Sequence, residues 1–124
     1  MTTRTLVMLS AAIEVIAGVA FIALPDRVAT RLLGSSISDI DRLVIRSTGI
    51  VLLSLGVAWW PREDIVTRPV ISTVFAFNLF AALYFGDLRV GGGLVGHLLW
   101  PACVLHALLA FLLARPAYES IKRA

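Results

Sequence analysis

The chain has 124 residues, of which 59% are hydrophobic and 15% are charged, and its net charge is +3 at pH 7. Soluble domains are about 45–50% apolar, and so short a chain lacks the interior volume to hide this much apolar surface from water. The eleven Lys and Arg residues are scattered singly between apolar runs, without the basic stripe or motif of a nucleic-acid-binding protein. The composition predicts one integral membrane domain over residues 1–124, with the lipid bilayer as its surroundings and no nucleic-acid partner.

Four apolar runs are long enough to cross a bilayer, at residues 5–24, 43–60, 65–85 and 94–114. A helix rises ~1.5 Å per residue and the hydrocarbon core is ~30 Å thick, so about 20 apolar residues span it. Glu14 interrupts the centre of the first run, which is atypical of a cleaved signal peptide, so all four spans are expected to be retained. The predicted fold is all-α, a membrane four-helix bundle.

The connections between the runs carry helix-cap and turn signals. Residues 25–34 begin with Pro25, end at Gly34 and separate apolar from basic side chains, which predicts a short amphipathic helix lying in the membrane interface. Ser38 or Asp39 is expected to cap the second span, with Asp41 in its first turn. The other ends are predicted at the interfacial pair Trp59 and Trp60, at Gly86 and at Arg115–Pro116.

The orientation of the chain follows from its basic residues. With four spans both termini lie on one side of the membrane, together with six Lys and Arg residues: Arg4, Arg62, Arg68, Arg115, Lys122 and Arg123. Four lie on the other side, Arg27, Arg31, Arg42 and Arg89, with Arg46 unassigned. This narrow bias favours a bacterial inner (cytoplasmic) membrane protein with both termini in the cytoplasm.

Each predicted span contains one conspicuous polar residue: Glu14, Arg46, Asn78 and His106, with His97 nearer one end of the fourth span. A charge at the bilayer centre costs at least ~2.5–3.5 kcal/mol, so such groups usually face the bundle interior and find partners. Counting from the predicted span ends places Glu14, Asn78 and His106 in a deep layer and the other two in a shallow one. These residues either satisfy one another as interhelical hydrogen bonds or form a solute or proton site.

Glu14 is the sharpest single candidate for a functional residue. It shares a helix face with Ser10, Ala17 and Gly18, small residues that let another helix approach closely. Burial would favour its neutral form, as a proton-exchanging group requires, whereas a nearby Arg46 would favour the carboxylate. The sequence leaves both outcomes open.

The fourth run offers a weaker metal hypothesis. His97 and His106 are nine residues apart, which is half a turn net, so they cannot share one ion within a helix. Cys103 and His106 do share a face and are weak candidates as metal ligands, with Glu14 as a third. A packing cysteine beside a hydrogen-bonding histidine is the simpler alternative, so no metal or cofactor is predicted.

Pro101 predicts a kink in the same run. Its ring removes the hydrogen bond to the carbonyl of His97, four residues back, and crowds that oxygen. With Trp100 beside it and Arg46 opposite, this bent turn is a candidate ligand mouth.

Two resemblances accompany these patterns. The segment AAIEVIAGVAFIAL resembles the first helix of the small multidrug resistance transporters, which implies that Glu14 is a proton- and cation-exchanging carboxyl; the later spans depart from that family. Most of the chain, through RSTGIVLLSLGVAWW, FNLFAALYF and LLWPACVLHALLAFLLA, is more similar to a group of small, uncharacterised four-span bacterial inner-membrane proteins. That second resemblance implies the fold and the membrane, and no reaction.

The chain contains no phosphate loop, HExxH or nucleophile–base motif, so no enzyme activity is predicted. The first functional hypothesis is binding or proton-linked transport of a small solute through Glu14, with Asn78 and His106 as partners and Arg46, His97 and Trp100 at the entrance. A homodimer is expected with it, because four short helices enclose little volume. The alternative is a non-catalytic structural or assembly subunit of a larger membrane complex, with the small-residue pairs Ser10/Gly18, Gly49/Gly56 and Gly92/Gly96 at helix interfaces.

Overall fold

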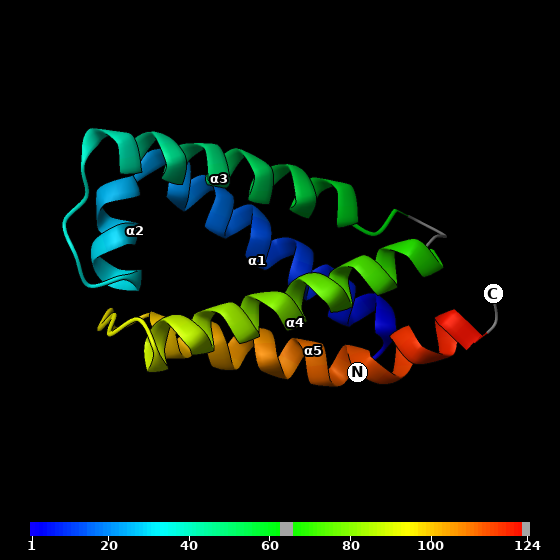
Figure 1. Ribbon diagram of the computed structural model, residues 1–124. Coiled ribbons are helices and arrows are strands. Elements are labelled where there is room, and N and C mark those ends of the chain that lie inside the picture. The colour runs from blue at the N-terminus through cyan, green and yellow to red at the C-terminus, as the bar shows by residue number, and fades with distance from the viewer. Residues whose placement is uncertain (63–65, 123–124) are drawn as a thin grey trace.

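The computed structural model describes residues 1–62 and 66–122. The start of the predicted third span at residue 65 and Arg123 lie outside these ranges. The described chain is all-helical, with helices α1 (Thr3–Ala23), α2 (Pro25–Leu32), α3 (Asp39–Trp59), α4 (Arg68–Val90) and α5 (Leu99–Lys122) (Figure 1). Three of these helices, α1, α4 and α5, are long and apolar enough to cross a membrane.

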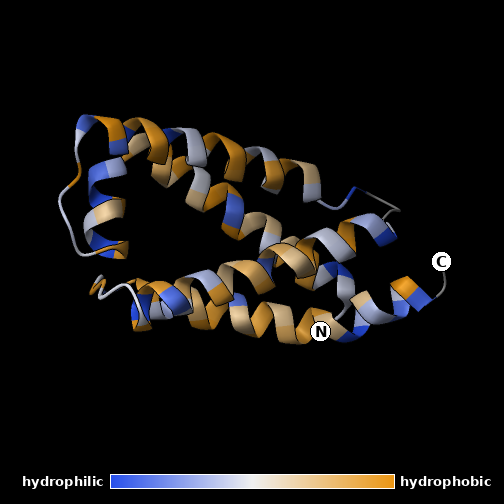
Figure 2. Ribbon diagram, viewed as in Figure 1, coloured by the Kyte–Doolittle hydropathy of each residue, from blue (hydrophilic) through white to orange (hydrophobic). Residues whose placement is uncertain are grey.

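The helices form two antiparallel pairs, α1 with α3 and α4 with α5 (Figure 1). The pairs meet at the end that holds the N-terminus and diverge toward the end that holds α2 and the loop after α4. Hydrophobic residues dominate the long helices, while α2 and the helix ends are more polar (Figure 2). The arrangement is therefore a wedge, narrow at one end and wide at the other.

Glycines explain why α1 and α3 lie so close together. A Cβ on Gly18 would lie 2.5 Å from the backbone nitrogen of Leu53, and a Cβ on Gly49 would lie 2.8 Å from the carbonyl oxygen of Gly18. Gly56 is equally close to α1, because its Cβ would lie 2.7 Å from the carbonyl oxygen of Ala11. Small residues allow this backbone contact between helices in lipid, where no hydrophobic force drives helices together. The predicted small residues Gly18, Gly49 and Gly56 thus lie at an interface within one chain.

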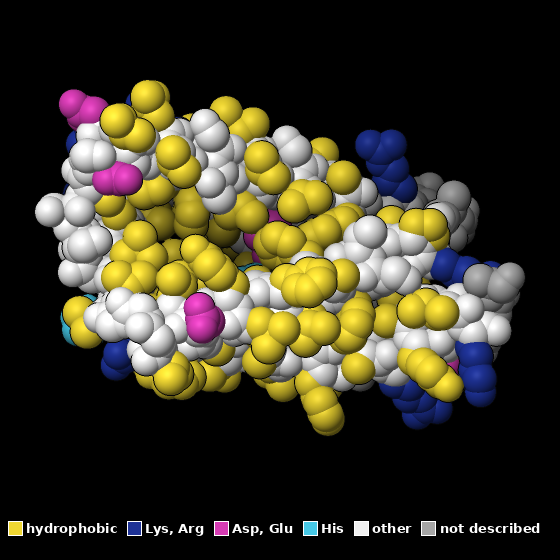
Figure 3. All heavy atoms as spheres, viewed as in Figure 1, with side chains coloured by type: hydrophobic (Ala, Val, Ile, Leu, Met, Phe, Trp, Pro, Cys, Tyr) yellow, Lys and Arg dark blue, Asp and Glu magenta, His cyan; other side chains and the backbone are white. Residues whose placement is uncertain are grey.

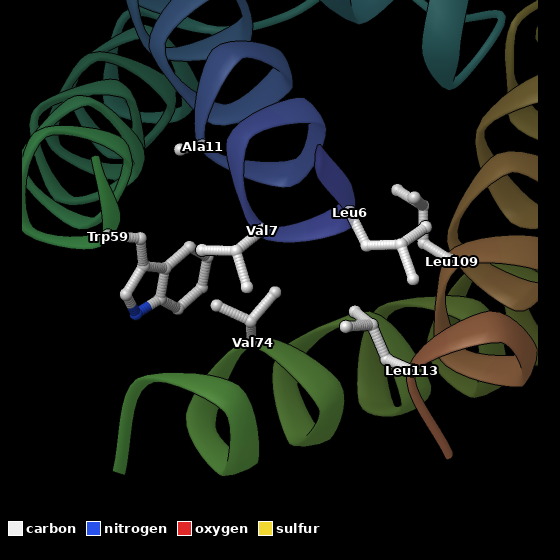
Figure 4. Close-up of a cluster of buried hydrophobic side chains, with 7 residues drawn as sticks. All are labelled: Leu6, Val7, Ala11, Trp59, Val74, Leu109 and Leu113. Atoms are coloured by element: carbon white, nitrogen blue, oxygen red, sulfur yellow. The ribbon is translucent and has the colours of Figure 1, made fainter. Parts of the chain in front are cut away.

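The narrow end of the wedge holds the apolar core, to which four helices contribute (Figure 4): Leu6, Val7, Ala11, Trp59, Val74, Leu109 and Leu113. The indole of Trp59 packs edge-on against the ring of Phe77, with 5.3 Å between centroids. α3 ends at Trp59, which is buried, whereas the next residue, Trp60, is half-exposed. The difference arises because α3 ends with Trp59 facing the α4–α5 pair.

The predicted caps before α3 are confirmed. Pro25 begins α2, and Gly34 follows it with a φ of 78° that favours glycine. The Ser38 hydroxyl accepts from the backbone N–H of Asp41, whose carboxylate accepts from the backbone N–H of Ser38 in return. The amphipathic helix predicted at residues 25–34 is present as α2.

Two later helix ends differ from the predictions. α4 continues through Gly86 to Val90, and α5 continues through Pro116 to Lys122. α5 begins only at Leu99, so Pro101 lies in its first turn, where a missing N–H breaks no intrahelical hydrogen bond. The predicted kink with a freed carbonyl at His97 is wrong, because His97 precedes the helix.

Candidate functional site

A cavity of about 380 Å³ lies between the two helix pairs where they diverge. Its walls come from all five helices and the residue before α5, and consist of Ile13, Glu14, Ala17, Ala20, Phe21, Val28, Leu32, Leu52, Phe77, Ala81, Phe85, Leu98, Pro101, Ala102, Leu105 and His106. Figure 3 shows the hollow on the side of the bundle, with hydrophobic walls and acidic and histidine atoms deep inside it. The cavity is apolar apart from two titratable residues, Glu14 from α1 and His106 from α5.

The α2 helix closes the wide end of this cavity. Val28 and Leu32, on its apolar face, line the wall. The loop before α5 lies against α2, because the backbone N–H of Leu98 donates to the carbonyl of Arg31 over 2.8 Å. A side chain at Gly96 would collide with the carbonyl of Leu32, so only glycine fits this contact. The cavity therefore opens through the side of the bundle rather than through this end.

Glu14 lies deep in the cavity with one carboxyl oxygen, Oε1, unsatisfied. The residue is 2% exposed, and its Oε1 has no hydrogen-bond partner within residues 1–62 and 66–122. A buried polar atom without a partner is uncommon, because the lost hydration costs about 1–3 kcal/mol. An ionised carboxylate in such surroundings is costlier still unless a cation shares the site. The position therefore calls for an additional hydrogen-bonding group.

His106 is held by a polar network across three helices. Its Nδ1 lies 2.9 Å from Oδ1 of Asn78 on α4, and Nδ2 of Asn78 donates to the carbonyl of Val74 over 2.9 Å and to Oγ of Ser10 on α1 over 3.3 Å. Because the amide nitrogen of Asn78 is committed to acceptors, its Oδ1 accepts, and Nδ1 of His106 is the donor. Asn78 and Ser10 are completely buried. The sequence singled out Asn78 but gave Ser10 only the role of a small residue.

The tautomer of His106 determines what it offers to the cavity. With the proton on Nδ1, the neutral ring carries a bare Nε2, which is a hydrogen-bond acceptor. The rings of Phe77 and Phe85 flank the imidazole, with centroids 6.0 and 5.6 Å away, and restrict its rotation. The cavity therefore presents the Glu14 carboxyl and the Nε2 of His106 between aromatic and aliphatic walls.

The residues of the predicted deep layer lie at or behind the cavity, and those of the predicted shallow layer do not line it. Glu14 and His106 line one cavity and Asn78 supports it from behind, whereas Arg46, His97 and Trp100 are exposed and do not line it. Arg46 faces the polar end of the bundle, where its charge helps lower the pKa of Asp26. Among the described residues Glu14 has no ion pair with Arg46, so that alternative for Glu14 is not realised.

Cys103 lies on a different side of α5 from the cavity. Its Sγ donates to the carbonyl of Ala82 on α4 over 3.4 Å, and it borders an outer groove between these two helices. Nowhere in the described ranges do three or more His, Cys, Asp or Glu residues gather as a metal site would require. The packing alternative fits the position of Cys103.

Sequence reasoning missed two features near the cavity. It gave α2 only a place on the membrane surface, although the apolar face of α2 supplies a cavity wall. It also missed that Arg42 clasps α2 to α3, with Nη2 2.8 Å from Oδ1 of Asp26 and Nη1 2.5 Å from Oδ1 of Asp39. Opposite charges at the two helix starts were the only available signal for this clasp.

Comparisons of the chain with protein-family models, curated proteins and solved structures found no match.

Proposed function

We propose that this protein is a four-span membrane protein that binds a small, largely apolar solute in the cavity between its helix pairs, with Glu14 as the group that exchanges a proton when the solute binds. The observation that carries the proposal is the unpartnered Oε1 of Glu14, 98% shielded from solvent and facing a cavity of about 380 Å³. Small-molecule sites are typically cavities of about 300–1,000 Å³ with apolar walls and a few converging polar groups.

The unpartnered Oε1 of Glu14 supplies an energetic reason for a solute to bind. A solute that bonds Oε1 of Glu14 removes a desolvation penalty that the empty site carries. The network through Asn78 holds the His106 ring before the solute arrives, so little ordering cost falls on binding. Glu14 and His106 are the two titratable residues among those lining the cavity, which makes them the groups through which solute and proton would compete.

The membrane arrangement that we propose uses α3 as the fourth span. It is 21 residues long, runs beside α1, and has its four charged residues within its first eight positions, toward one end. The four long helices alternate in direction, so the N-terminus and the end of α5 share one end of the bundle (Figure 1). With the bias in basic residues, this supports a bacterial inner-membrane protein with both termini in the cytoplasm.

Binding to the protein in lipid nanodiscs tests the proposal. The probes are 1-naphthylmethylamine and 1-naphthalenemethanol, measured by calorimetry in two buffers that differ in ionisation enthalpy. We expect saturable one-to-one binding of at least one probe. We expect Glu14→Gln to abolish any proton exchange between protein and buffer, because its amide does not titrate.

A cavity-filling variant provides the matched control. Ala81→Phe places a ring in the cavity, whereas Ala107→Phe adds the same ring at an exposed position of α5. We expect the first variant to lose binding and the second to keep it. Absence of saturable binding by both probes, or equal binding to both variants, would overturn the proposed function.

A further inference from the structure

We propose that the groove between the end of α3 and the start of α4 binds one anionic phospholipid, with the phosphate at Arg62 and an acyl chain along the apolar floor of the groove. The inference goes beyond the proposed function, because it concerns neither the cavity nor Glu14. It shares with the proposed function only the membrane arrangement, in which α3 and α4 are consecutive spans. It is drawn from the shape of the groove, the groups at its mouth and the charge of this end of the molecule.

The groove has a volume of about 600 Å³ and shares no lining residue with the cavity of Glu14 and His106. Its inner part is lined from within the two helices by Leu53, Ser54, Val57, Ala58 and Val70. Its mouth is lined just beyond the helix ends by Trp60, Arg62 and Thr67. The hydroxyl of Ser54 donates to the carbonyl of Ile50 over 2.8 Å, so it is already satisfied within α3. The groove therefore has an apolar inner part and a polar mouth.

The inner part of the groove has the length and chemistry of an acyl-chain site. From Leu53 to its last residue, Trp59, α3 rises ~9 Å. One leaflet contributes ~15 Å, half of the ~30 Å hydrocarbon core, so the groove covers much of the thickness of a leaflet. A chain that lies along it exchanges lipid for protein surroundings that are equally apolar, so the floor accepts the chain of any phospholipid. Selection between lipids therefore falls on the headgroup.

The mouth offers hydrogen-bond donors to a headgroup. Arg62 is exposed, and its guanidinium has no hydrogen bond or ion pair within the part of the chain that the structure describes, in contrast to Arg42 and Arg115. An arginine presents a planar fork that binds a phosphate through two parallel hydrogen bonds. Thr67 precedes α4 without capping it by its side chain, and the indole of Trp60 is half-exposed, so both are free to donate as well. The lining residues include no carboxylate that would repel a phosphate.

The charge of the narrow end favours an anionic headgroup. Figure 3 shows several Lys and Arg side chains around this end, and its one described acidic residue, Glu119, pairs with Arg115 over 2.9 Å. In the sequence this end has six basic and three acidic side chains, with Glu63 and Asp64 counted, whereas the opposite end has five basic and four acidic. The net charge is thus +3 here and +1 there. Lys and Arg residues beside a membrane attract anionic lipids. An anionic phospholipid combines the phosphate that the mouth attracts with the chain that the inner groove accepts.

Quenching of Trp60 fluorescence by brominated lipids tests the inference on the full chain in liposomes. Trp100→Phe removes the other half-exposed tryptophan, and Trp59 is buried in the core, so the accessible emission comes from Trp60. Phosphatidylcholine liposomes receive increasing mole fractions of either dibrominated phosphatidylglycerol or dibrominated phosphatidylcholine. We expect phosphatidylglycerol to reach half-maximal quenching at a mole fraction about tenfold lower, because its headgroup forms charge-assisted hydrogen bonds without a competing cation.

Variants separate a specific site from diffuse attraction. Arg62→Gln should remove the preference for phosphatidylglycerol, and Arg62→Lys, which keeps the charge and loses the fork, should retain part of it. Arg4→Gln removes one charge from the same end, outside the groove, and should keep the preference. Ala58→Phe fills the groove and should also remove the preference, whereas Val51→Phe adds a ring at an exposed position of α3 outside the groove and should keep it.

Two results would overturn the inference. The first is an equal half-maximal mole fraction for the two lipids in the protein with Arg62. The second is a loss of preference in Arg4→Gln as large as in Arg62→Gln, which would show attraction to the whole end rather than binding at the groove. Either result leaves solute binding in the cavity unaffected, and a failure of solute binding leaves the lipid site standing, because the two share no lining residue.

Discussion

The Nδ1 of His106 donates to the Oδ1 of Asn78 over 2.9 Å, across the interface between α5 and α4. This hydrogen bond fixes the tautomer of a buried histidine and turns its other nitrogen into an acceptor for the cavity. Asn78 in turn bonds Ser10, so the pair also ties α4 and α5 to α1. One polar chain therefore links the two helix pairs and prepares the candidate site.

Replacing Asn78 tests that network. Asn78→Leu keeps a similar volume but leaves Nδ1 of His106 without its acceptor, so we expect the free energy of unfolding to fall by about 1–3 kcal/mol. In the double variant Asn78→Leu with His106→Leu both partners are apolar, and the loss should be smaller than the sum of the single losses. Unfolding titrations in detergent micelles measure all three variants. Strictly additive losses would contradict a direct bond between the two residues.

The glycine contact between α1 and α3 makes a prediction with an internal control. Gly18→Ala would place its Cβ 2.5 Å from the backbone nitrogen of Leu53, and the backbones must separate, so we expect a loss of about 1–3 kcal/mol. Gly86→Ala adds the same methyl group in α4, where the nearest atom, Sγ of Cys103, is 3.7 Å away. That variant should be neutral or more stable by up to about 1 kcal/mol, because alanine favours helix. Thermal unfolding of both variants checks the contrast.

Glu14 should reduce stability in the absence of a ligand. Glu14→Met replaces a buried carboxyl that has an unpartnered oxygen with an apolar side chain, so we expect the free energy of unfolding to rise by about 1–3 kcal/mol. Unfolding of the ligand-free protein in detergent measures the gain. Glu119→Met removes an exposed carboxyl near the end of α5 and should leave stability almost unchanged. A clear loss of stability in Glu14→Met would show that the carboxyl has a structural partner.

The clasp between α2 and α3 should depend on pH. The hydrogen bonds and charge of Arg42 hold the pKa of Asp26 below its ordinary value of 3.8. A lowered pKa means that the contribution of this pair to stability is present above about pH 4 and is lost as the pH falls through the lowered value. Asp26→Asn should therefore have a slightly lower melting temperature than the native protein at neutral pH, and the two should converge in acid. Melting curves over that range, with Glu119→Gln as the exposed control, measure the effect.

The sequence was informative about the individual elements because their signals are local. Apolar runs of sufficient length, Pro25 at a helix start and the Ser38–Asp41 cap all act within one or two turns of helix. Helix ends within apolar sequence were harder to place. Gly86 and Pro116 are typical stop signals, yet the helices pass through both, because tertiary packing outweighs a local preference of about 1–3 kcal/mol.

The candidate site was predicted in part, because depth along a span is also a local property of the sequence. Depth along a span follows from counting residues, so Glu14, Asn78 and His106 could be assigned to one layer. Whether a residue faces inward depends on how its helix is rotated and which helix it meets, and this is why the sequence could not show that Arg46 and Trp100 are exposed and do not line the cavity. The sequence gave Ser10 only the role of a small residue, although a serine is both small and polar. The position of Asn78 in the fold decides that the hydroxyl of Ser10 accepts a hydrogen bond.

By itself the sequence determined that the chain is helical, apolar enough for a membrane and supplied with a carboxyl at the middle of its first long helix, since composition and spacing fix these properties locally. Only the tertiary structure decided that α1 pairs with α3, that the two pairs diverge, and that α2 closes the resulting cavity over Glu14 and His106. The physical reason is that helix pairing in lipid depends on backbone approach and side-chain complementarity between distant residues such as Gly18 and Leu53. Hydrophobicity alone is equally satisfied by many arrangements.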